Sequence, residues 1–403
     1  MISAARLRAR RAFTDVLRLR AFSAMATTTF LEGSATRTWG GHTAEHFCDE
    51  LVARYKQILD QQRLSWTEHH QLLRALGAGG QGVVFLSERR GTDSFTLPVA
   101  IKVFSPERYE DERSYDDAMG RMAQVAAHVA QIQQDNLLDV HNWIDRDRIR
   151  LMEMEWVDGF DLKRLLTQKM LEWIHYHVSN KRWRYVNQVI VTAGPIQPRV
   201  KPGVAIAIVR DCLAALAALH RNGIVHGDLK PSNIMLKRTG NAKIVDLGSA
   251  FELDNAPTRR SCTPTYAAPE VLDGEACTPR SDLASLGYVL IEMLSGSPAF
   301  AGLTSYQELL EAKRFLAQRL GRILPEEVVC NELLMSFCRG LVAPDPSRRF
   351  PSAEAADLLK EGAASFHRQL IKGDLASEYD NEIRLWLEEL DCPGEDDAPP
   401  KLE

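Results

Sequence analysis

The stretch His226-Gly-Asp-Leu-Lys-Pro-Ser-Asn233 sets a carboxylate, an ammonium group and an amide at fixed offsets in one tight loop. A protein that promotes phosphoryl transfer has little covalent chemistry to perform and mainly orients a hydroxyl and neutralises phosphate charge. Asp228 can accept the proton of an attacking hydroxyl, Lys230 can reach the migrating phosphoryl group, and Asn233 can bind Mg²⁺. The loop therefore predicts a site built for phosphoryl transfer.

Two motifs downstream of this loop fit the same chemistry. Asp246-Leu-Gly248 follows a predicted strand at Ala242–Val245. Its carboxylate adds an oxygen ligand where magnesium would bridge nucleotide phosphates, and Mg²⁺ favours such sparse oxygen ligation. Ala268-Pro-Glu270 then closes a segment of suitable length. Either motif alone would carry no meaning, so their order after the loop is what makes them informative.

Two motifs upstream suit the binding of a nucleotide. Gly77-Ala-Gly-Gly-Gln-Gly-Val-Val84 lies between predicted strands, and its glycines let backbone N–H groups close over phosphate oxygens. A dinucleotide-binding fold would instead need a helix after the loop. Lys102 lies in the apolar run Val99–Phe104, where a buried ammonium is unfavourable unless it meets an anion such as phosphate. Taken singly, a plain glycine hairpin and an outward-facing lysine remain open alternatives.

In this order the motifs resemble the eukaryotic-type (Hanks-type) serine/threonine protein kinase family, from about Leu72 to Leu359. The resemblance implies an α+β, bilobal protein-kinase fold, with a small antiparallel-β N-lobe that carries one helix and a larger, mainly α-helical C-lobe. It also implies an enzyme that uses ATP and Mg²⁺ to phosphorylate serine or threonine of protein substrates. Lys230 and the segment Thr263-Pro-Thr-Tyr266 favour these hydroxyls over that of tyrosine.

The resemblance also assigns roles to single residues. Asp282 corresponds to a buried helix carboxylate that supports the catalytic loop, Arg349 pairs with Glu270, and Met154 guards the nucleotide pocket. The catalytic residues would be Asp228, Lys230, Lys102 and Thr263; the nucleotide would contact Gly77, Gly79, Gly82, Val84, Ala100, Lys102, Glu155, Val157, Asp161 and Met235; and Mg²⁺ would bind Asn233 and Asp246.

The chain departs from the family pattern at two places. Gly227 stands where the family has an arginine that receives an activation-segment phosphate, so we expect activity without such phosphorylation. The helix glutamate that pairs with the strand lysine is also missing, because the family's spacing leads to Gln124. Gln124 could replace it, an insertion could bring Asp116 or Asp117 there, or Lys102 could lack a partner.

Two other functions stay open beside the kinase interpretation. A weakly active or inactive pseudokinase would serve as an ATP-binding scaffold, because a fold can host binding as well as catalysis. The intact Asp228, Lys230, Asn233 and Asp246 argue against it, since a scaffold has no chemical need of them. A kinase of small molecules is disfavoured by the Thr263–Glu270 segment, which resembles a docking platform for peptides.

Composition excludes several classes of protein. The chain has 403 residues, a formal charge of −5 and a pI near 6.2, without the basic excess of a nucleic-acid binder. Seven cysteines without a C-x-x-C pair support neither a disulfide framework nor a zinc site, and fit a reducing, cytoplasmic location. The longest apolar runs, Val204–Val209 and Cys212–Leu219, are too short to span a membrane.

Four regions are expected along the chain. An N-terminal extension, 1–66, begins with an arginine-rich leader whose composition resembles a transit peptide. The alternatives are a disordered basic leader, or a true start of the protein at Met25. The extension ends in a helix near 44–62. The N-lobe would span 67–157 and the C-lobe 158–370. Inside the C-lobe, an insertion at about 168–202, strand-like at Tyr185–Thr192, is a candidate docking site for a partner or simply an exposed hairpin. An acidic tail would fill 371–403, disordered from Asp391.

Overall fold

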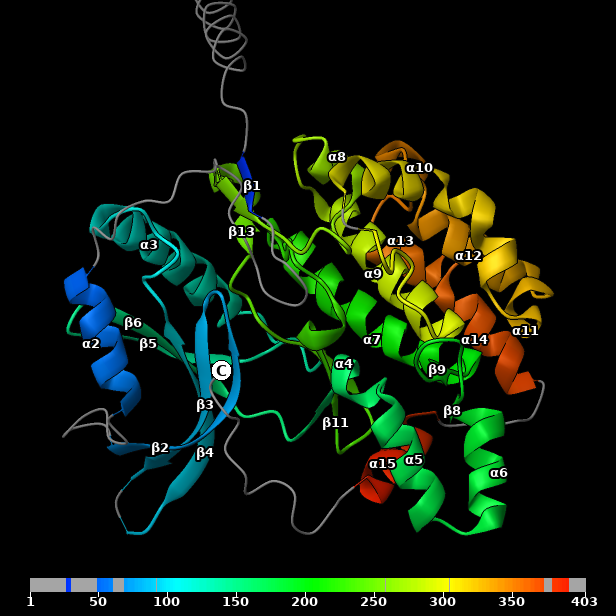
Figure 1. The fold of residues 1–403 in the computed structure, drawn as a ribbon, viewed down its shortest axis with the longest axis horizontal. Coiled ribbons are helices and arrows are strands. Elements are labelled where there is room, and N and C mark those ends of the chain that lie inside the picture. Colours follow the sequence, from blue (N-terminus) through cyan, green and yellow to red (C-terminus); the bar gives the residue numbers. More distant parts are fainter. Residues whose placement is uncertain are drawn as a thin grey trace, which may run out of the picture.

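The computed structural model describes residues 27–29, 49–60, 69–91, 93–257, 259–303, 305–372 and 379–390, which form two lobes (Figure 1). The N-lobe holds a five-stranded antiparallel sheet in which the most buried strand contains the predicted run Val99–Phe104. Its apolar, β-branched side chains suit a strand that is covered on both faces. The strands, in spatial order, are β2 (His69–Gly79), β3 (Gly82–Arg90), β4 (Thr96–Phe104), β6 (Ile149–Glu155) and β5 (Val140–Arg146).

Two helices accompany this sheet. Helix α3 (Glu112–Val129) begins after Asp111, whose carboxylate accepts the Ser114 N–H at 2.6 Å and so caps the first turn. The predicted N-terminal helix is observed as α2 (Asp49–Asp60), with apolar residues at helical spacing buried against the N-lobe. This gives the N-lobe a second helix beside the one that the resemblance implied.

Helices make up most of the C-lobe, around the buried α7 (Pro202–Arg221). By length and composition α7 could cross a membrane, but 78% of its apolar window is buried inside the lobe. The helices that pack on it are α9 (Pro279–Ser295), α13 (Ala353–Leu358), α14 (Ala363–Lys372) and α15 (Tyr379–Glu389). Further C-lobe helices are α4 (Leu162–Leu165), α8 (Pro269–Leu272), α10 (Tyr306–Ile323), α11 (Glu326–Val329) and α12 (Glu332–Leu341). This arrangement confirms the predicted bilobal α+β fold.

Short strands hold the loops that face the N-lobe. One small sheet runs in the order β12-β11-β7 and a second pairs β10 with β13, so both flank the His226–Asn233 loop. A third pair is parallel, between β1 and β14, and β14 belongs to the activation segment, which runs from Asp246 to Glu270. The remaining short elements are β1 (Thr27–Thr29), β7 (Gly159–Asp161), β8 (Val191–Thr192), β9 (Arg199–Val200), β10 (Ile224–Val225), β11 (Ile234–Lys237), β12 (Ala242–Ile244), β13 (Phe251–Glu252), β14 (Arg259–Ser261) and the 3₁₀ turns η1 (Pro231–Asn233), η2 (Leu253–Asn255) and η3 (Pro346–Arg348).

The insertion and the tail differ from expectation. The insertion forms two helices, α5 (Gln168–His177) and α6 (Asn180–Val189), so the strand predicted at Tyr185–Thr192 is wrong except for β8. Inside the predicted tail, α15 (Tyr379–Glu389) is a packed helix that is joined to α6 through Arg182 and can be followed in Figure 1. Residues 391–403, for which disorder was predicted, lie outside the described residues.

Candidate active site

Asp228 is the centre of a network that joins the catalytic loop to the activation segment. The Lys230 ammonium donates to Asp228 Oδ2 at 2.8 Å and to Thr263 Oγ1 at 3.0 Å. The Thr263 N–H donates to Asp228 Oδ1 at 2.8 Å, and Asn233 Nδ2 donates to the Asp228 carbonyl oxygen at 2.9 Å. Residues predicted to act together thus surround one carboxylate, which is only 5% exposed.

Asp282, on α9, binds the backbone of the His226–Asn233 loop. Its Oδ2 accepts the His226 N–H and its Oδ1 accepts the Gly227 N–H, each at 2.9 Å, while His220 Nε2 lies 2.9 Å from Oδ2. Burial acts to raise the pKa of this carboxyl group, but the hydrogen bonds and the nearby histidines outweigh burial and lower it. Asp282 therefore stays ionised and holds two backbone donors of the loop in place.

The backbone conformation at position 227, directly after His226, favours glycine. Gly227 has a φ of +76°, a conformation that side-chain-bearing residues rarely adopt, and an added Cβ would lie 3.0 Å from the Ser249 carbonyl oxygen. The family's arginine is absent at this position, so the catalytic loop offers no cation there to receive a phosphate from the activation segment.

Lys102 and Asp246 meet between the two lobes. The ammonium group donates to Asp246 Oδ1 at 2.5 Å, and the Gly248 N–H donates to the same oxygen at 3.1 Å. Burial acts to raise the pKa of Asp246, but Lys102 and Lys230 outweigh burial and hold that pKa well below its usual range. Asp246 also has a positive φ of 66°, an uncommon backbone conformation that turns the chain at this motif.

The expected replacements for the missing glutamate are wrong. Gln124 is exposed and its Oε1 accepts from Asn255 Nδ2 at 3.5 Å, while Asp116 accepts from Arg148 and Arg150 at 2.9 and 3.1 Å. Asp117 is exposed. None of the three is among the buried residues of α3, which are Tyr115, Met119, Val125, Ala126 and Val129.

Lys102 nevertheless has a second partner, which the motifs did not indicate. Its ammonium group donates to Gln81 Oε1 at 2.7 Å. Gln81 comes from the glycine-rich loop itself, so the lysine is bound by the β2–β3 hairpin and by Asp246, rather than by α3. The only signal in the sequence was an amide at a loop tip otherwise made of small residues.

The glycine-rich loop is the tip of the β2–β3 hairpin. Gly82 has a φ of +138°, and a Cβ there would lie 1.9 Å from the Val103 carbonyl oxygen, so the fold itself requires glycine. At Gly77 and Gly79 an added Cβ would meet no heavy atom within 4 Å. These two glycines leave open space above the loop backbone, as expected where a ligand approaches it closely.

The residues predicted to contact the nucleoside part of the nucleotide come from both lobes. Ala100 lies opposite Met154 in the sheet, and Met235 lies opposite Asp161. Burial raises the pKa of Asp161, and one of its oxygens accepts the Arg164 N–H at 2.9 Å to cap α4. Val84, opposite Lys102, and the hinge residues Glu155 and Val157 complete the predicted set.

The segment Thr263–Glu270 is anchored at three points. The Lys313 ammonium donates to the Thr265 carbonyl oxygen at 2.7 Å, and Tyr266 Oη donates to Glu292 Oε2 at 2.6 Å. Arg349 forms two parallel bonds to the Glu270 carboxylate, both 2.7 Å, which confirms the predicted pairing. Burial lowers the pKa of Lys313, and the rings of Tyr288 and Phe300 lie 4.1 Å from its nitrogen.

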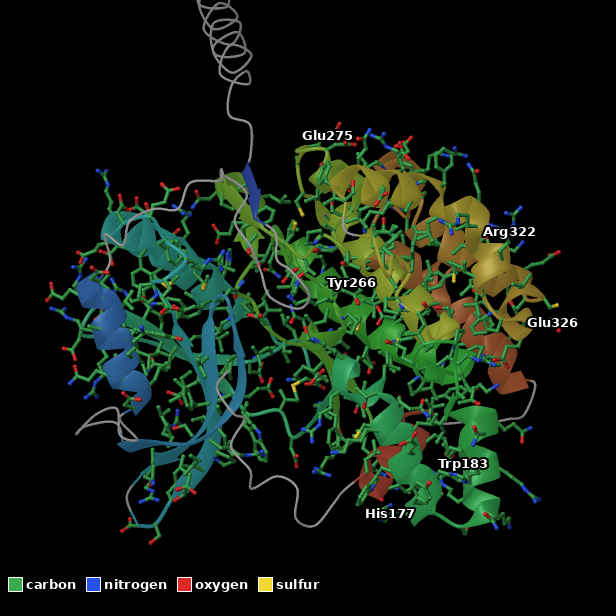
Figure 2. The ribbon with its side chains drawn as sticks, in the orientation of Figure 1. His177, Trp183, Tyr266, Glu275, Arg322 and Glu326 are labelled. Atoms are coloured by element: carbon green, nitrogen blue, oxygen red, sulfur yellow. The ribbon has the colours of Figure 1, made fainter. Side chains whose placement is uncertain are left out.

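The insertion lies away from this network. Figure 2 shows His177 and Trp183 at the edge of the C-lobe, whereas Tyr266 lies near the middle of the molecule. Aromatic rings of the α5–α6 insertion stack on one another, as Trp173 does on His177 with centroids 3.6 Å apart. Arg182 of α6 donates to Glu389 of α15 at 2.5 Å, so one face of the insertion binds a helix of the same chain.

Comparison with known proteins agrees with this geometry. The protein kinase domain model matches residues 70–359. Serine/threonine-protein kinase PrkC of Bacillus subtilis (strain 168) is 28% identical over 292 residues, which cover 71% of this chain and 39% of the relative. PknD of Mycobacterium tuberculosis is 30% identical over 294 residues, covering 70% and 38%, and PknB of Mycolicibacterium smegmatis is 29% identical over 320 residues, covering 74% and 44%.

The chain spans about two fifths of the length of these relatives. The part that matches contains the glycine-rich loop, Lys102, the Asp228 network and Asp246, which are the features brought together between the lobes. The family model also covers more than half of the chain. This chain belongs to the protein kinase family, in its Hanks-type serine/threonine branch.

Proposed function

We propose that the chain is an ATP- and Mg²⁺-dependent protein kinase that phosphorylates serine or threonine in protein substrates. The observation that carries this proposal is the Asp228 carboxylate, held by Lys230 and by the Thr263 N–H. In this arrangement Asp228 orients the substrate hydroxyl and accepts its proton. Lys230, fixed between Asp228 and Thr263, offsets the negative charge that develops on the transferred group.

The residues present fit a nucleotide with magnesium. Asn233 Nδ2 is committed to the Asp228 carbonyl oxygen, so its side-chain oxygen and the Asp246 carboxylate are the donors offered to a cation. Mg²⁺ commonly takes few protein ligands and completes its shell with phosphates and water. When bound, ATP supplies the phosphoryl group and Mg²⁺ offsets the charge of its phosphates. Lys102 and the open backbone at Gly77 and Gly79 would hold those phosphates.

A protein substrate is favoured over a small molecule by the anchored segment Thr263–Glu270. Its Glu270 carboxylate is 6% exposed and bound by Arg349 and Ser281, the latter through Oγ at 2.7 Å. Such a buried, paired carboxylate keeps the segment in one conformation, because separating it from its partners would be strongly unfavourable. A segment held in one conformation beside Asp228 suits the docking of a peptide.

The proposal is tested by incubating the purified protein with labelled ATP, Mg²⁺ and a generic acceptor such as casein, followed by phosphoamino-acid analysis. We expect label on serine or threonine, and its loss by at least about a thousandfold in Asp228→Asn, which cannot accept the proton. Ser285→Ala, which changes a buried residue of α9 outside the network, serves as the control. Binding of ATP without transfer in the wild-type protein would refute the enzyme and favour the scaffold.

A further inference from the structure

Gln81 is a loop-tip residue with unusually little exposure. It lies in the two-residue turn between β2 and β3, where a polar side chain would normally reach into water, yet it is 8% exposed. Its carbonyl oxygen accepts the Ser105 N–H at 3.0 Å, which ties the tip to the end of β4. The side chain is therefore directed beneath the loop instead of outward.

Both polar atoms of the Gln81 side-chain amide have hydrogen-bond partners. Gln81 Oε1 accepts from Lys102 at 2.7 Å, and Nε2 donates to Ser249 Oγ at 3.2 Å. The space is tight, because a Cβ added at Gly248 would lie 1.7 Å from Gln81 Oε1 and 2.8 Å from Lys102 Nζ. One amide thus links the glycine-rich loop, the strand lysine and the segment that carries Asp246.

The buried ammonium group of Lys102 requires hydrogen-bond acceptors, and Gln81 Oε1 is one of them. The ammonium group is 4% exposed, and a buried cation is destabilising unless hydrogen-bond acceptors surround it. Asp246 provides one acceptor, but Asp246 is also a proposed magnesium ligand. The second acceptor, which in the family pattern is a helix carboxylate, does not come from α3 in this chain, whose buried side is apolar.

We propose that Gln81 is a positioning residue, which holds Lys102 in place of the missing helix carboxylate. Its side-chain oxygen accepts from the ammonium group, as a carboxylate oxygen would, and so fixes where that group can meet phosphates. The inference rests on the proposed function only through the nucleotide that Lys102 would bind. Its consequence is that the glycine-rich loop, rather than the position of α3, determines whether the lysine is correctly placed.

The first test measures binding and does not require catalysis. Wild type, Gln81→Ala and Gln81→Glu are titrated with a non-hydrolysable ATP analogue plus Mg²⁺, and separately with adenosine, which has no phosphates. We expect Gln81→Ala to weaken the affinity for the analogue about three- to tenfold. The affinity for adenosine should change less than about twofold, because only phosphates meet Lys102. Gln81→Glu, which keeps an acceptor at the same reach, should restore the affinity for the analogue.

The second test measures transfer, with kcat and the KM for ATP determined separately. We expect Gln81→Ala to lower kcat about tenfold or more, and Gln81→Glu to recover most of it. Gln71→Ala, which removes a glutamine side chain from β2 of the same hairpin, is the matched control. It should leave both constants unchanged.

Two results would overturn the proposal. Unchanged or tighter binding of the ATP analogue by Gln81→Ala would show that the side chain is idle, or that it only fills space which the nucleotide must clear. Failure of Gln81→Glu to recover affinity would show that the hydrogen bond to Lys102 is not what matters. If the wild-type protein transferred no phosphate at all, the proposed function would fail, while the binding comparison would still decide the role of Gln81.

Discussion

Asp282 Oδ1 accepts the backbone N–H of Gly227 at 2.9 Å, and this bond connects the core of the C-lobe to the residue next to Asp228. Gly227 is in the left-handed region with a φ of +76°, so the chain turns sharply between His226 and Asp228. A carboxylate with both oxygens facing backbone donors is well suited to hold such a turn. The position of the proposed base is therefore set by a residue more than fifty positions away in the sequence.

Asp282→Asn should disturb the loop while keeping the shape of the side chain. The amide offers one acceptor oxygen instead of two and turns an N–H₂ group towards a backbone N–H. We expect a loss of about 2 to 4 kcal/mol in the free energy of unfolding and at least a tenfold fall in kcat. Urea unfolding and phosphate transfer would measure them, with Ser285→Ala on the same helix as control. Wild-type activity in Asp282→Asn would contradict a supporting role.

The catalytic loop could be predicted because its geometry is local. Asp228, Lys230 and Asn233 are so close in the sequence that their offsets alone bring them together, and the structure places them around one carboxylate. The pairing of Arg349 with Glu270 was also predictable, but only through the family resemblance, since nothing in the local sequence connects them.

The partner of Lys102 could not be predicted from spacing. The sequence shows an amide at position 81, but the direction of a side chain at a hairpin tip depends on how the tip folds onto β4. Counting along α3 suggested Gln124, yet the rotation of a helix about its axis is decided by which residues are buried. Val125 and Val129 face inward, and this leaves Gln124 exposed.

Two segments were assigned to the wrong structure for different reasons. Tyr185–Thr192 is rich in β-branched residues, a weak preference that packing overrode, because Val186 and Val189 are buried at helical spacing. The acidic composition of 371–403 concealed an amphipathic helix, in which Ile383, Trp386 and Leu387 recur at the same spacing. Overall charge described the solvent side of α15 and not its buried side.

A matched pair of glycine substitutions should separate folding from ligand binding. Gly82→Ala would place a Cβ 1.9 Å from the Val103 carbonyl oxygen at a φ of +138°, so we expect a marked loss of thermal stability. Gly79→Ala meets nothing within 4 Å, so its stability should stay within about 1 kcal/mol of wild type. Its affinity for an ATP analogue should fall severalfold. Equal stabilities of the two variants would contradict this assignment.

Asp211 should make stability depend on pH between about 4 and 6. Its carboxylate on α7 accepts the Ala242 N–H at 2.7 Å, and burial raises its pKa to about 6. The unfolded value is about 3.9, so the folded state binds the extra proton and stability falls as pH rises through this window. Asp211→Asn keeps an acceptor and carries no charge.

At pH 7.5 we expect Asp211→Asn to be more stable than wild type by about 1 to 2 kcal/mol, and the difference to vanish near pH 4. Urea unfolding at several pH values measures this, with the exposed Asp117→Asn as control. A difference that grew towards low pH would show that the shift has the opposite sign.

Trp386→Ala should release α15 from the C-lobe. The indole is 1% exposed and is among the largest fully buried side chains, so its removal would leave a cavity between α15 and the helices beneath it. Substitutions of this kind destabilise by about 3 to 5 kcal/mol, which exceeds what one short helix can recover by rearrangement. We expect limited proteolysis to cut the variant within residues 379–390 much faster than the wild-type protein. Arg384→Ala, on the exposed face of the same helix, should be cut at the wild-type rate. If the two variants were cut equally, burial of Trp386 would not be what holds α15 in place.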